Sequence, residues 1–129
     1  MRAVDTNVLV RFFIEDDPVQ FRRARKVIES GAVLIPKTVL LETEWVLRQG
    51  YGLTSAEVLQ TFTALCSAAE VEIEDFDTVQ NALAWFAKGM DFADALHVAS
   101  RGSAVEFLTF DKKLCAAARG AGIKGVVQA

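Results

Sequence analysis

The chain has 129 residues, which suits one domain able to bury roughly two-thirds of the surface that its unfolded form exposes. Hydrophobic residues make up 52% of it and the formal net charge is −3, which excludes a disordered chain and a protein that coats nucleic acid through bulk charge. No apolar run approaches the roughly 20 residues of a membrane helix, and Asp5 and Asn7 interrupt the region where a signal peptide would be apolar. We therefore expect a single cytoplasmic domain over residues 1–129, with no membrane partner.

Short apolar segments alternate with helical segments along the whole chain. Asp17 followed by Pro18 marks a helix start, Gly31 marks its end, and Thr54 with Glu57 forms a capping box that opens a later helix. The expected strands cover residues 2–5, 32–36, 71–75, 106–110 and 123–128. The expected helices cover residues 7–14, 18–31, 37–50, a stretch after residue 54, 77–89, 89–100 and 111–122.

This alternation of strands and helices predicts an α/β fold. We expect three layers, α/β/α, with a short and mostly parallel sheet of four or five strands and helices on both faces. The two cysteines, Cys66 and Cys115, lie in helical segments and are too few for a disulfide scaffold, so we expect free thiols packed in the core.

Three aspartates fall where strands give way to helices. Asp5 ends the first strand, Asp111 follows strand 106–110, and Asp94 lies in the first turn of helix 89–100. Sites in open parallel sheets form at the carboxyl ends of strands, so these acids are expected to converge on one sheet edge. Helix capping is the alternative for each of them, because aspartate is a common cap at a helix N-terminus.

A fourth acid, Glu42, lies in the middle of helix 37–50, where capping gives it no role. Its neighbours three and four residues away include Val39 and Val46, whereas Glu44 has Arg48 four residues on and can form an exposed ion pair with it. We therefore expect Glu42 to be the more inward acid and Glu44 the more solvated one.

Clustered carboxylates are costly unless a cation compensates them. Mg²⁺ and Mn²⁺ prefer oxygen ligands, and two such ions about 4 Å apart can position a water and stabilise a leaving oxygen in phosphodiester cleavage. His97 is the only histidine, one turn beyond Asp94, and we expect it to be a packed or surface residue. A zinc site is not expected, because it would need several His or Cys ligands.

Four segments of the chain resemble, in order, the acidic motifs of PIN-domain ribonucleases. They read AVDTNVLVRFF, LLETEWVLR, DFADALHVAS and FLTFDKKL, and are most similar to the VapC toxin half of bacterial and archaeal VapBC toxin–antitoxin pairs. The resemblance implies a ribonuclease that cleaves RNA with one or two Mg²⁺ or Mn²⁺ ions. It also implies a homodimer and a small antitoxin protein that blocks the site.

Carried over position by position, the resemblance assigns the catalytic acids and metal ligands. These are Asp5, Glu42, Asp94 and Asp111. Thr6, Asn7 and Thr109 lie beside these acids in the sequence and are expected to orient them. Asp91 is an extra acid that either caps its helix, which we favour, or supports the site.

Other classes of protein use similar acids. A phospho-receiver signalling module would need an acid pair after the first strand and an acceptor aspartate after a middle strand, but Asp5 stands alone and the middle strand ends in Pro36. An aspartyl-nucleophile phosphatase begins with Asp-x-Asp, and Asn7 replaces the second acid here. A catalytically silent partner-binding domain would have the same composition, and metal-dependent cleavage distinguishes it from a nuclease.

Overall fold

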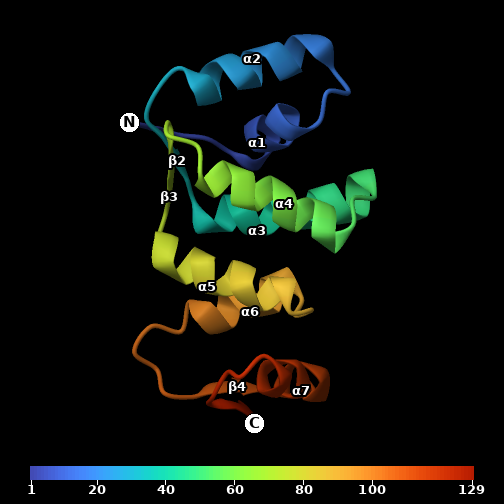
Figure 1. Cartoon of the computed structure of the whole chain (residues 1–129), viewed down its shortest axis with the longest axis vertical. Helices are drawn as coiled ribbons and strands as arrows, with labels where there is room; N and C mark the ends of the chain where they lie inside the picture. Colours follow the sequence, from blue (N-terminus) through green and yellow to red (C-terminus); the bar gives the residue numbers. More distant parts are fainter. The chain divides into compact units, whose positions relative to one another are not determined.

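A computed structural model describes all residues 1–129 and confirms the α/β class of fold (Figure 1). Seven α-helices, one π-helical turn and five short strands alternate along the chain, and every strand pair is parallel, consistent with a three-layer α/β/α fold. The five strands are split between a three-stranded and a two-stranded sheet. The chain divides into two compact units, residues 1–76 and 77–129, and each is described by itself.

The first unit contains the three-stranded sheet, with β2 in the middle and β1 and β3 on either side. Val33 and Ile35 of β2 are fully buried, as is typical of a central parallel strand. The elements of this unit, in chain order, are β1 (Arg2–Ala3), α1 (Thr6–Phe13), α2 (Pro18–Glu29), β2 (Val33–Ile35), α3 (Lys37–Trp45), the π-helical turn η1 (Val46–Gly50), α4 (Ser55–Cys66) and β3 (Val71–Ile73).

The sequence signals for helix ends in this unit are confirmed. Asp17 caps α2 by accepting hydrogen bonds from the N–H groups of Val19 and Gln20, and Pro18 occupies the first helical position. The capping box at α4 is complete, since Thr54 accepts from the Glu57 N–H while the Glu57 carboxylate accepts from the Thr54 N–H. These local contacts fix where the helices begin.

Helix α3, which carries Glu42, begins without a cap of its own. Pro36 precedes it and has no side-chain acceptor to offer. Glu74, just after β3, accepts a hydrogen bond from the Lys37 N–H at 2.8 Å, and Asp75 pairs with the Lys37 ammonium at 2.9 Å. The end of β3 therefore anchors the start of α3, because its carboxylates satisfy a helix N-terminus that the local sequence leaves open.

The core of the first unit lies where α1 packs against α2 and α3. The side chains of Leu9, Ile28, Leu40 and Phe62 are almost fully buried, and the rings of Phe13 and Phe62 lie 6.4 Å apart. This packing holds the N-terminus of α1 against α3. Asp5 caps α1, Thr6 is its first residue, and Glu42 lies on α3.

The second unit contains the parallel pair β4 (Phe107–Thr109) and β5 (Val126–Gln128), which α7 (Lys112–Gly120) connects. Helices α5 (Phe76–Ala87) and α6 (Phe92–Ala99) precede them, and the rings of Phe86 and Phe92 meet edge to face at 5.4 Å. Gly125 enters β5 with φ +84°, and a Cβ there would lie 2.3 Å from the Val105 carbonyl oxygen, so only glycine fits.

Two further expectations concern the whole chain. Cys66 and Cys115 are not joined in a disulfide, and both are half-buried rather than the core residues that the sequence predicts. None of the helices has the length and apolar character needed to cross a membrane.

Candidate active site

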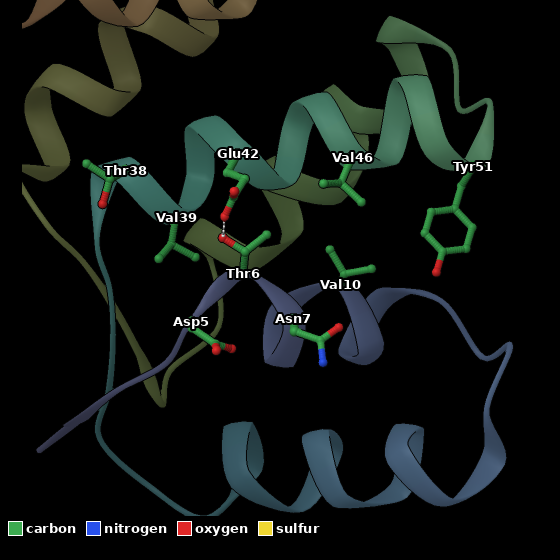
Figure 2. Close-up of a pocket in the computed structure, with 9 residues that line it drawn as sticks. All are labelled: Asp5, Thr6, Asn7, Val10, Thr38, Val39, Glu42, Val46 and Tyr51. Carbon is green, nitrogen blue, oxygen red and sulfur yellow. Dashed lines mark hydrogen bonds between the residues drawn. The ribbon is translucent and has the colours of Figure 1, made fainter.

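Two of the four expected acids, Asp5 and Glu42, line one pocket in the first unit (Figure 2). The pocket has a volume of about 660 Å³ and lies beyond the carboxyl ends of β1 and β2, where sites form in parallel sheets. Its lining residues come from the start of α1, from α3 and from the turn that follows: Asp5, Thr6, Asn7, Val10, Thr38, Val39, Glu42, Val46 and Tyr51.

Asp5 caps helix α1 and also borders the pocket. Its Oδ1 accepts a hydrogen bond of 3.0 Å from the Val8 N–H, which fixes the carboxylate at the helix N-terminus. The cap engages Oδ1, and Oδ2 is the oxygen that remains for a ligand. Capping and ligand binding, which the sequence offers as alternatives for this residue, are therefore chemically compatible.

Glu42 is held by a side chain from the neighbouring helix. The hydroxyl of Thr6 on α1 donates a hydrogen bond to Glu42 Oε1 on α3, drawn as the dashed line in Figure 2. Glu42 is exposed to solvent within the pocket, so its carboxylate is accessible to a cation. The contact links the residue that follows Asp5 to the second acid, and so restricts how the two carboxylates can move.

The expected exposures of Glu42 and Glu44 were wrong. Glu44 is only 1% exposed, and Glu42 is the solvated acid. Helical spacing explains the difference, because Leu40, Glu44 and Leu47 share the buried face of the helix while Glu42 lies on the opposite side. The expected pair between Glu44 and Arg48 does form, at 2.5 Å, but it is half-buried rather than exposed.

In the second unit, Asp94 lies in a negative environment. Burial raises the pKa of the Asp94 carboxyl above its ordinary value, and the charges of Asp91 and Asp111 raise the pKa further. The only opposing influence is that of His97, which lowers this pKa to a smaller degree and is itself exposed. Three carboxylates thus repel one another here, which is the setting that a bound cation relieves.

Asp91 and Asp111 both cap helices in this unit. Asp91 accepts a hydrogen bond of 3.1 Å from the Asp94 N–H and so caps α6, the role that the sequence favours. Asp111 Oδ1 accepts from the N–H groups of Lys113 and Leu114 at the start of α7. Thr109 Oγ1 in turn accepts from the Asp111 N–H at 3.0 Å, which orders the turn between β4 and α7.

The chemistry of these side chains fits Mg²⁺ or Mn²⁺. The candidate ligands are carboxylate and hydroxyl oxygens, which hard divalent cations prefer. The structure contains no group of three or more His, Cys, Asp or Glu side chains arranged to hold an ion. It groups Asp5 with Glu42 in one unit, and Asp94 with Asp91 and Asp111 in the other.

Two polar residues that line the pocket, Thr38 and Tyr51, are not among the residues that the sequence predicts for the site. Tyr51 is the only tyrosine in the chain and stands between Gly50 and Gly52, directly after the helix that carries Glu42. An aromatic residue between two glycines at the end of a site helix is a signal that could have identified it.

Parallel strands joined by helices, with acids after the strand ends, define an α/β protein with a carboxylate-lined pocket at a sheet edge. The chain belongs to the PIN domain family, which matches residues 2–120 and so spans both units and all four candidate acids. PIN domains are generally nucleases that use divalent metal ions, and PIN-domain nucleases bind RNA. No curated protein and no solved structure matches the chain.

Proposed function

We propose that this protein is a divalent-metal-dependent ribonuclease that hydrolyses RNA phosphodiester bonds. The observation that carries the proposal is the pocket in which Thr6 holds Glu42 beside the helix cap formed by Asp5, in a chain that belongs to the PIN family. We assign catalysis and metal binding to four acids of one domain over residues 1–129, namely Asp5, Glu42, Asp94 and Asp111.

A bound Mg²⁺ or Mn²⁺ would supply activation of a water molecule and stabilisation of the leaving oxygen. The protein's own residues supply fixed ligands. The helix cap immobilises the Asp5 carboxylate, and Thr6 orients that of Glu42. In the other unit Asp91 caps the helix that carries Asp94 and Asp111 caps α7, and the repulsion that both carboxylates exert on Asp94 favours cation uptake. Thr109 and Asn7 are assigned supporting roles.

We further propose that the ribonuclease is the toxin of a VapBC-type toxin–antitoxin pair. The order and spacing of the four acidic motifs, in a chain of 129 residues, support this assignment. It entails a cytoplasmic enzyme that forms a homodimer and is inhibited by a small antitoxin protein, and whose activity slows growth through loss of translation.

Controlled expression in a bacterial host tests the toxin assignment. Wild-type protein should arrest growth, and Asp5→Asn should not, because the substitution removes a metal ligand but keeps a side chain able to cap α1. Asp17→Asn is the matched control, since Asp17 caps α2 and has no assigned role in the site. Equal arrest by wild type and Asp5→Asn, at equal protein levels, would contradict the assignment.

A further inference from the structure

The pocket that contains Asp5 and Glu42 has two chemically different ends. Figure 2 shows the oxygen-bearing side chains of Asp5, Thr6 and Glu42 on one side, and Tyr51 at the other, with Val10 and Val46 between them. None of the nine lining residues is basic. Lysine or arginine therefore does not neutralise RNA phosphates in this pocket, and another interaction must position the RNA there.

Tyr51 is fixed by its hydroxyl group rather than by burial of its ring. The hydroxyl donates a hydrogen bond of 2.9 Å to Asp16 Oδ2, and Arg11 forms an ion pair with the other oxygen of Asp16. The residue remains 37% exposed and lines the pocket. The hydrogen bond to Asp16 raises the pKa of Tyr51 above its usual range, so the hydroxyl keeps its proton at neutral pH.

The backbone around Tyr51 also sets its position relative to Glu42. Helix α3 widens into the π-helical turn η1, an irregularity often found at functional sites. Gly52 follows with φ +70°, and the Leu53 N–H bonds to the Leu47 carbonyl at 3.0 Å. The chain thus leaves the helix directly after Tyr51, which lines the pocket together with Asp5 and Glu42.

We propose that the Tyr51 end of this pocket is a nucleobase subsite. The Tyr51 ring stacks on one base of the RNA, Val10 and Val46 contact its apolar edge, and the adjoining phosphodiester is thereby positioned at Asp5 and Glu42. Single-stranded nucleic acids are commonly held by bases stacked on aromatic side chains. Tyr51 is a positioning residue in this scheme, and the proposal rests on the ribonuclease function.

The test compares how RNA affinity changes when the Tyr51 ring is removed from the protein and when one base is removed from the RNA. Affinities are measured by fluorescence anisotropy for short single-stranded RNA oligonucleotides, in the Asp94→Asn background so that the RNA stays intact. A series of oligonucleotides carries one abasic site at each successive position. The variants are Tyr51→Ala, Tyr51→Phe and, as a control, Phe76→Ala, which removes an aromatic ring that is 46% exposed and lies outside the pocket.

Tyr51→Ala should weaken binding of intact RNA about 5- to 150-fold, the range for loss of one stacked base. Tyr51→Phe keeps the ring but loses the hydrogen bond to Asp16, so it should weaken binding less than Tyr51→Ala does, and Phe76→Ala should change little. At one position of the series, the abasic site should cause the same loss as Tyr51→Ala, and the two losses should not add. Additive losses at every position, or unchanged binding by Tyr51→Ala, would overturn the subsite.

A second measurement needs no substitution at Tyr51 and so does not depend on the folding of its variants. RNA containing 5-iodouridine is crosslinked by light to the Asp94→Asn protein, in which Tyr51 is intact. The peptide that carries the crosslinked RNA should contain Tyr51. Crosslinks found only in other peptides would overturn the nucleobase subsite. If the wild-type protein still cleaves RNA in a metal-dependent way, the proposed ribonuclease function would stand. A chain that neither binds nor cleaves RNA would overturn both.

Discussion

At the scale of single residues, Asp94 is the acid whose ionisation disfavours the folded protein. Its pKa is raised above the ordinary value of 3.8 by burial and by two neighbouring carboxylates. A group with a raised pKa in the fold contributes stability below its ordinary pKa, and that contribution is lost as the pH rises through the raised value. At neutral pH the ionised Asp94 therefore destabilises the metal-free protein.

Asp94→Asn should accordingly raise the melting temperature of the metal-free protein at neutral pH, while it abolishes the stabilisation that Mg²⁺ or Mn²⁺ gives the wild type. Thermal melts in EDTA and in millimolar metal, with Asp17→Asn as the control, measure both effects. A variant that melts lower than wild type in EDTA, yet is still stabilised by metal, would show that Asp94 serves the fold and not the ion.

A substitution at Thr6 tests whether its hydrogen bond to Glu42 orients the carboxylate for metal binding. Thr6→Val keeps the shape of the side chain but removes the hydroxyl that donates to Glu42. Loss of such an orienting hydrogen bond typically costs about 10- to 100-fold in metal affinity or activity, with little change in stability. Thr63→Val is the control, because its hydroxyl contacts only the Leu59 carbonyl on α4. Equal metal affinity of the two variants, by calorimetric titration, would remove Thr6 from the site.

At the scale of elements, helix α3 shows what the sequence pattern could and could not predict. The helical segment 37–50 begins after Pro36 and ends at Gly50 as predicted, but it consists of α3 and the π-helical turn η1, which the sequence pattern did not indicate. The pair between Glu44 and Arg48 follows from their spacing. Which face is buried depends on the packing of α3 against α1 and of η1 against α4, and the local sequence does not contain these partners. The spacing of Glu44 and Arg48 indicates an exposed pair, yet only the long side chain of Arg48 reaches solvent while Glu44 is buried.

Arg48→Ala should therefore lower the free energy of unfolding far more than an ordinary surface substitution does. It leaves the Glu44 carboxylate, 1% exposed, without its partner, and removing the partner of a buried charge costs up to about 3–5 kcal/mol in the free energy of unfolding. Arg25→Ala breaks a pair of the same spacing whose side chains are 58% and 51% exposed, and should cost about 0.3–0.5 kcal/mol. Similar midpoints for both variants in urea would contradict the burial of Glu44.

At the scale of the whole molecule, the α/β class was predictable because strand and helix signals alternate throughout and most helix ends carry local caps. The pairing of strands was not, since β1 has two residues and its partner is set by Val33 and Leu34 far along the chain. The position of the Tyr51 side chain was not predictable either, because it depends on the hydrogen bond to Asp16, which Arg11 holds in turn.

RNA cleavage by the purified protein tests the central claim most directly. A structured RNA pool is incubated with wild type, Asp5→Asn or Asp17→Asn, in Mg²⁺, Mn²⁺ or EDTA, with folding of each protein verified by circular dichroism. We predict cleavage by wild type and Asp17→Asn in metal only, and none by Asp5→Asn under any condition. Cleavage that persists in EDTA, or that Asp5→Asn retains, would contradict a metal-dependent ribonuclease whose ligands include Asp5.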